Sequence, residues 1–132
     1  MQSGGGGGLA AQALTAGDRF VEQYYSGFSR SSGKYYQASS KVMWNGNGYS
    51  GEQFKATVLP QLQRQLTAFE VTGYDSHTLG GGGGEGGDSS ERTLVNVSGL
   101  VKIDRKERFA QTFVIERSGT LMYIQSDCFR LV

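Results

Sequence analysis

The sequence has few of the residues that build disulfide frameworks and metal sites. Its 132 residues include one cysteine, Cys128, and one histidine, His77. A single cysteine excludes an internal disulfide, and these two residues alone do not make a metal-ligand cluster. The sequence also lacks an apolar run long enough for a signal peptide or a membrane span. We therefore expect the chain in a reducing compartment, the cytosol or the nucleus.

A strong excess of one charge is also missing. Thirteen basic residues stand against twelve acidic ones, which gives a formal net charge of +1. A domain that binds nucleic acid by itself usually carries a marked basic excess or stripe. The densest basic stretch, residues 102–108, is interrupted by two acidic residues. It is interpreted as a solvated hairpin tip, with weak RNA contact as the alternative.

Glycine is abundant, and much of it lies in two tracts, residues 4–8 and 80–87. No Lys-Ser or Lys-Thr pair follows the second tract, so it does not have the pattern of a phosphate-binding loop. We predict a flexible tail over residues 1–8 and a flexible glycine-rich loop over residues 80–90. The remaining chain, residues 9–132, holds enough aromatic side chains for the core of a single domain.

The first half of this domain has helical patterns. Apolar residues recurring at helical spacing predict one long amphipathic helix over residues 9–29, with its aromatic side toward the core. A short second helix is expected over residues 34–39. Helical spacing returns over residues 51–59, where Pro60 predicts a kink or a restart of the helix, because proline has no amide hydrogen and disfavours α geometry in the preceding residue.

The other segments are predicted to be strands. Residues 41–44 form a strand that ends in a tight turn, because Asn45-Gly46 readily adopts the positive φ values of a hairpin. A meander of four strands follows, over residues 67–79, 92–103, 108–117 and 121–132. The sequence thus predicts an α+β fold, with the N-terminal helices packed on one face of a strongly curved antiparallel sheet.

The two faces of this predicted sheet differ in composition, since side chains alternate along a strand. One face collects large apolar residues such as Val95, Phe113 and Phe129, and we expect it to pack against the helices. The opposite face is small, half-apolar and low in charge, unlike most solvated sheet faces. Such a surface is usually covered by a partner. We predict a partner-binding face made of Asn96, Ser98, Leu100, Ala110, Thr112, Val114, Ile124, Ser126, Cys128 and Arg130.

Three segments resemble a known family. They are residues 18–25 with the pattern Asp-Arg-Phe-Val-Glu-Gln-Tyr-Tyr, residues 42–51 around the Trp-Asn-Gly-Asn hairpin, and the Ser-Asp-Cys-Phe-Arg sequence at 126–130. They resemble the first helix, the tryptophan hairpin and the final strand of the nuclear transport factor two-like family. The hairpin and the ending are most similar to the branch that forms the small subunit of nuclear mRNA export receptors.

The resemblance implies a protein-binding subunit without a cofactor, a small-molecule substrate or a membrane contact. In that branch the small subunit forms a heterodimer with the related domain of the large, TAP-type subunit through the sheet face opposite the helices. Asn96, Thr112, Cys128 and Arg130 would then face the partner, with Arg130 against an acidic residue. The implied location is the nucleus and the nuclear pore, with shuttling to the cytoplasm. Contact with nucleoporins and RNA through the complex stays open.

Two other functions occur on the same fold. Carriers of the small GTPase Ran, which homodimerise, present acidic residues in the loop corresponding to 104–107, but here Arg105 and Lys106 dilute the acidic charge. Isomerases and dehydratases of this fold use a tyrosine and an aspartate inside the cone, for which Tyr24, Tyr25 and Asp127 are candidates. Because many aromatic side chains are expected to fill the cone, we predict that the protein is not an enzyme.

Overall fold

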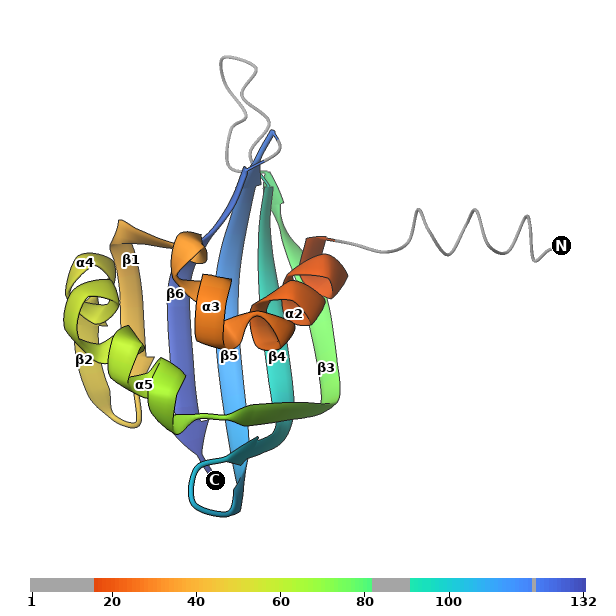
Figure 1. Cartoon of the computed structure of the whole chain (residues 1–132). Helices are drawn as coiled ribbons and strands as arrows, with labels where there is room; N and C mark the ends of the chain where they lie inside the picture. Colours follow the sequence, from red (N-terminus) through yellow and green to blue (C-terminus); the bar gives the residue numbers. More distant parts are fainter. Residues whose placement is uncertain (1–15, 82–90, 120) are drawn as a thin grey trace, which may run out of the picture.

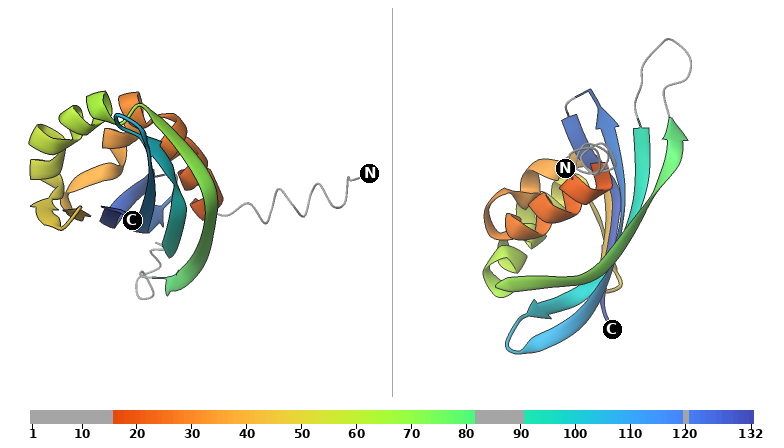
Figure 2. Two further views of the ribbon diagram at one scale, coloured as in Figure 1. Left: turned by 90° about the horizontal axis from the view of Figure 1, so that it is seen from below. Right: turned by 90° about the vertical axis from the view of Figure 1, so that its right-hand side faces the viewer.

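The structure is a computed structural model that describes residues 16–81, 91–119 and 121–132. Helices and strands of the described residues form one α+β unit, in which the helices lie on one side of a bent sheet (Figures 1 and 2). The predicted glycine tail over 1–8 and the predicted start of the first helix over 9–15 lie outside the described residues. The same holds for residues 82–90 of the predicted glycine-rich loop.

Over the described residues, the first helical segment is more broken than the sequence pattern predicts. Helix α2 (Ala16–Ser26) and the short α3 (Phe28–Ser31) are separated at Gly27. A 3-10 turn over Ser32–Tyr35 follows, and strand β1 (Tyr36–Trp44) begins directly after it. The predicted helix over residues 34–39 is therefore wrong from Tyr36 onward, because this segment pairs with the last strand of the sheet instead.

The predicted hairpin and the predicted irregularity near Pro60 are both confirmed. Asn45 and Gly46 have φ values of 49° and 87°, which is the left-handed backbone that this turn needs, and they connect β1 to β2 (Asn47–Ser50). Helix α4 (Gly51–Gln53) passes through a π-helical segment, Phe54–Val58, into α5 (Leu59–Gln65). The wider π turn ends at Val58, two residues before Pro60, whose ring opposes regular α geometry in the preceding turn.

The remaining strands form the predicted meander: β3 (Ala68–Gly81), β4 (Glu91–Lys102), β5 (Lys106–Ser118) and β6 (Leu121–Leu131). The six-stranded sheet has the order β2-β1-β6-β5-β4-β3. All its neighbouring strands are antiparallel except β1 and β6, which run parallel, so the sheet is mixed. Strand β3 continues through Gly80 and Gly81, which pair with Arg92 and Glu91, so these two residues belong to the sheet and not to the predicted loop.

The core lies between the helices and the concave side of the sheet (Figure 2). Phe20 of α2 packs its ring 4.7 Å from that of Phe113 on β5. The ring of Trp44 on β1 stacks on that of Phe129 on β6, with 4.1 Å between their centroids. The ring of Phe54 also contacts Trp44, with 5.4 Å between the two centroids. These aromatic contacts join the helices, the hairpin and the meander, so the α+β prediction with helices on one sheet face is confirmed.

A β-bulge at Gln125 changes the predicted faces of the last strand. Val114 pairs with Ser126, whereas the next residue, Ile115, pairs with Ile124, which leaves Gln125 as an extra residue in β6. The alternation therefore reverses, and Ile124 points into the core with 0% exposure. Its assignment to the partner-binding face is wrong, and Tyr123, which pairs with Glu116 across the strands, lies on the outer side of the sheet.

Gly99 of β4 allows the backbone of β3 and the ring of Phe109 to approach β4 closely. A β-carbon at this position would lie 2.3 Å from the backbone oxygen of Glu70 and 2.9 Å from the ring of Phe109. We expect Gly99→Ala to lower the free energy of unfolding by about 1–3 kcal/mol, the usual cost of overpacking. Denaturant unfolding measures the change. Gly48→Ala is the control, because a β-carbon there meets no atom within 4 Å, and an equal loss for both variants would contradict the steric explanation.

Candidate protein-binding face

The sheet side opposite the helices is built from three cross-strand rows, and we call it the outer face. The rows are Lys41-Ser126-Val114-Leu94, Met43-Cys128-Thr112-Asn96 and Arg130-Ala110-Ser98, continued by Leu100. Nine of the ten residues predicted for partner binding lie on this face; Ile124 is the exception. The side chains alternate with buried residues such as Val95, Val97 and Phe113, which fixes their direction away from the core.

The outer face is accessible and only moderately polar. Asn96, Ser98, Cys128 and Arg130 are exposed, whereas the other predicted residues on this face are half-buried. Thr112 donates a hydrogen bond to Asn96 across the strands, with 3.0 Å between the two oxygens. This leaves a surface of small and aliphatic side chains, the kind that is suited to a second protein.

Sequence alternation missed the contribution of strand β1 to this face. Met43 pairs with Cys128 and is 44% exposed, and Lys41 pairs with Ser126. Their outward direction follows from the buried neighbours Val42 and Trp44, but nothing in the local sequence shows that β1 lies next to β6. The parallel pairing places an exposed methionine beside the predicted cysteine and so extends the apolar part of the outer face.

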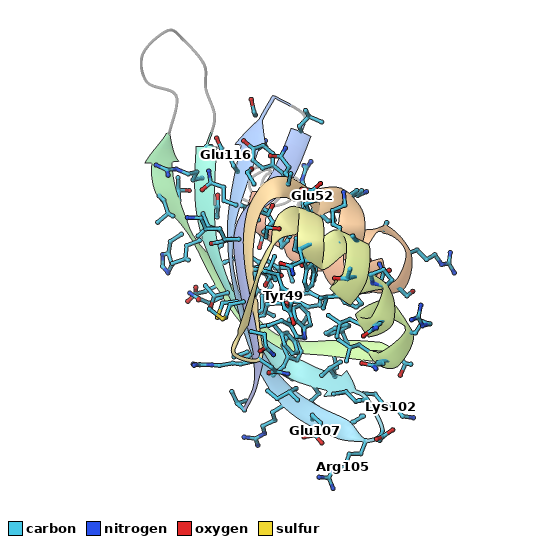
Figure 3. The ribbon with its side chains drawn as sticks, turned by 90° about the vertical axis from the view of Figure 1, so that its left-hand side faces the viewer. Tyr49, Glu52, Lys102, Arg105, Glu107 and Glu116 are labelled. Carbon is cyan, nitrogen blue, oxygen red and sulfur yellow. The ribbon has the colours of Figure 1, made fainter. Side chains whose placement is uncertain are left out.

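The charges that β1, β4, β5 and β6 contribute to the outer face are mostly positive. Lys41, Arg92, Arg108 and Arg130 lie on it, and all four are exposed. Glu116, at the upper end of the sheet in Figure 3, accepts a short hydrogen bond from Gln125. A partner with acidic side chains would complement this distribution of charge.

The hairpin between β4 and β5 carries basic residues beside its two acidic ones, Asp104 and Glu107. Arg105 donates to Glu107 at 3.0 Å, and Figure 3 shows Lys102, Arg105 and Glu107 together at this end of the sheet. Lys106 lies 3.7 Å from Glu70 of β3. The tip is therefore a mixed and partly paired group of charges, which agrees with its interpretation as a solvated hairpin end.

The candidates for catalysis meet in the core in one hydrogen-bonded cluster. Tyr36 donates to Asp127 at 2.5 Å and lies 2.7 Å from the hydroxyl of Tyr24. Gln111 donates to the other oxygen of Asp127 at 2.8 Å and accepts from Tyr25 at 2.7 Å. The sequence analysis did not identify Tyr36 and Gln111 as members of this cluster, since neither has a local signal that distinguishes it from other strand residues.

This Tyr–Asp cluster is enclosed by aromatic rings. Asp127 is 2% exposed and Tyr24 is 0% exposed, with the ring of Phe113 4.9 Å from that of Tyr24. Burial raises the pKa of Asp127 from 3.8 to about 7, although hydrogen bonds from Tyr36 and Gln111 oppose the shift. Burial also raises the pKa of Tyr24 and of Tyr36 well above 10.0. The tyrosines therefore stay neutral, and the cluster satisfies its polar groups internally.

Neither a metal centre nor a membrane span is found in the part of the chain that the structure describes. No group of histidine, cysteine, aspartate and glutamate side chains among these residues is placed to hold a metal ion. None of the described helices combines the length and apolar character that a membrane crossing requires.

Known proteins share both the sequence pattern and the fold. Residues 16–131 match the nuclear transport factor 2 (NTF2) domain. The chain is 30% identical over 128 residues to NTF2-related export protein 1 of Bos taurus, covering 90% of this chain and 88% of that protein. It is also 30% identical over 124 residues to the NTF2-related export protein of Caenorhabditis elegans, covering 86% and 84%. Nuclear transport factor 2 of Cryptosporidium parvum superposes with a TM-score of 0.64 at 25% identity, covering 88% and 91% of the two chains.

These matches confirm the resemblance that residues 18–25, 42–51 and 126–130 carry. The chain belongs to the nuclear transport factor 2 (NTF2) domain family.

Proposed function

We propose that this protein is the small, protein-binding subunit of a heterodimeric nuclear mRNA export receptor. Its outer face pairs with a related NTF2 domain in the large, TAP-type receptor subunit. The pair passes through the nuclear pore, and this chain shuttles between nucleus and cytoplasm with it. Nucleoporins and RNA are then contacts of the complex as a whole, and this subunit needs no cofactor for its task.

The observation that carries this proposal is the outer face itself. Four long strands present small and half-apolar side chains there, with Met43 44% exposed and Arg130 exposed at the end of β6. A stable interface buries on the order of 1,600 Å² in total, which a face of this breadth can supply. The names of the two relatives with 30% identity, both NTF2-related export proteins, support nuclear export as the process.

Two alternatives on this fold have less support. Ran carriers are disfavoured by the hairpin tip, where Arg105 pairs with Glu107 and Lys106 approaches Glu70. An isomerase or dehydratase would use the Tyr–Asp cluster, but a general base must reach its substrate. Asp127 is 2% exposed and its two oxygens already accept from Tyr36 and Gln111. We therefore propose a structural role for this cluster and no catalysis.

Co-expression with the NTF2 domain of a TAP-type subunit tests the proposal. We expect a one-to-one complex by size-exclusion chromatography with light scattering, because the outer face is too apolar to stay uncovered beside a complementary sheet. Ran loaded with GDP serves as the competing ligand in a parallel experiment. A chain that binds Ran and ignores the receptor domain would contradict the proposal.

A further inference from the structure

Strand β3 forms a long free edge of the sheet. Among the described strands it pairs only with β4, and it spans Ala68–Gly81. Shifts in pairing at Thr72 and Leu79 divide it, and the six residues between these irregularities, 73–78, pair regularly with β4. An edge strand presents backbone amide and carbonyl groups to which another extended chain can bond. This regular stretch is long enough for a short peptide strand.

A groove runs beside this edge, between α2 and β3. Its volume is about 510 Å³, and Val21, Tyr25 and Val71 supply apolar lining together with the half-exposed ring of Tyr74. Tyr74 also donates a short hydrogen bond to Asp18, which links the strand to the helix. A strand added to β3 would direct every second side chain toward α2 and into this groove, because strand side chains alternate.

Acidic side chains predominate around the groove and on the edge strand. Asp18 and Glu22 of α2 line the groove opposite a single cation, Arg19. On β3 itself, Glu70 and Asp75 have side chains 61% and 64% exposed. Glu70 lies 3.7 Å from Lys106, and Asp75 lies 3.4 Å from His77, but pairs this exposed are weak in water. The local potential therefore favours a cationic ligand.

We propose that the α2–β3 groove and the free edge of β3 bind an extended peptide in which apolar residues alternate with lysine or arginine. The apolar side chains enter the groove, the cationic ones face Glu70 and Asp75, and backbone hydrogen bonds join the peptide to residues 73–78. The groove lies on the helix side of the sheet, whereas Glu70 and Asp75 continue the outer face beyond Leu100 and Asn96, with which they pair. It gives the protein a second docking surface, at the edge of the sheet beside α2.

Calorimetric titration of the full chain with an acetylated, amidated (Val-Lys)4 peptide tests the site. We expect binding with a Kd below about 1 mM. Asp75→Lys should weaken it about fivefold, because Asp75 faces the cationic side chains of the peptide and its side chain is exposed; this corresponds to the upper range for one exposed ion pair. Glu52→Lys is the matched control, because it makes the same charge change at an exposed position on α4, away from the groove, and should leave the Kd unchanged.

The backbone contribution is tested with a (Val-Lys)4 peptide that is N-methylated at alternate residues. Loss of its amide donors should weaken binding about tenfold or more, since several hydrogen bonds are removed at once. Amide exchange should slow at residues 73–78 only with the unmethylated peptide. The proposal is overturned if no binding is seen at 1 mM, if Glu52→Lys weakens binding as much as Asp75→Lys, or if the methylated peptide binds equally well.

Discussion

Replacing Asp127 with asparagine should remove much of the pH dependence of this protein's stability. The carboxyl group has a pKa of about 7 in the folded protein against 3.8 when unperturbed. The folded state therefore holds a proton that the unfolded chain releases between these two values, and stability falls as the pH rises from about 4 to about 7. Each unit corresponds to about 1.4 kcal/mol, so the loss between pH 5 and pH 8 is about 2–3 kcal/mol.

Asparagine keeps the shape of the side chain and has no charge to bury. The amide oxygen of asparagine can accept from Gln111, and its NH2 group can donate to the hydroxyl of Tyr36. That hydroxyl can then donate to the hydroxyl of Tyr24, 2.7 Å away. Between pH 5 and pH 8 the unfolding free energy of wild type should fall by about 2–3 kcal/mol more than that of Asp127→Asn, because asparagine does not ionise. Urea unfolding at both pH values measures it. Parallel pH profiles for the two proteins would show that Asp127 ionises without penalty.

Truncating Arg130 should weaken the proposed heterodimer at least tenfold. Arg130 is exposed on β6, where it pairs across the sheet with Ala110, and it lies on the outer face with Arg108. Once a partner covers the face, the guanidinium requires a carboxylate or carbonyl oxygens, and its planar fork suits a bidentate carboxylate. Removing one member of a buried charged pair costs about 2–5 kcal/mol, much of it from the charge left without a partner.

Calorimetry with the receptor domain compares Arg130→Ala with Arg105→Ala. Arg105 carries the same charge, but its side chain is 86% exposed at the hairpin tip, where it pairs with Glu107. The control variant should change the affinity little, and both variants should keep the circular dichroism of wild type. Equal losses, or a loss for Arg105→Ala alone, would place the partner at the hairpin tip and not on the outer face.

The parts of the fold that depend on local patterns were predictable. The Asn45-Gly46 turn follows from the positive φ that these two residues tolerate, and the break near Pro60 follows from its missing amide hydrogen. Regular alternation in β4 and β5 placed Asn96 and Thr112 on the face opposite the helices. Each of these features is determined within a few neighbouring residues, which is the range over which sequence patterns are informative.

Features that depend on distant pairing were not predictable in the same way. Tyr36 enters a strand because β6 lies beside it, and the parallel contact of β1 with β6 adds Met43 to the outer face. Gln111 joins Tyr25 and Asp127 only because β5, β6 and α2 meet in the core. Residues 86 and 16 positions apart in the chain make these bonds, and no local period encodes them.

The sequence by itself determined the α+β class, the apolar inner face and most of the outer face, because side-chain direction in a regular strand depends only on alternation. The tertiary structure decided the direction of Ile124 and Tyr123. A bulge at Gln125 reverses the alternation in β6, and it is visible only as a change in pairing with β5. It also decided that the carboxyl of Asp127 is enclosed, since a pKa depends on the packed surroundings of a group and not on its sequence neighbours.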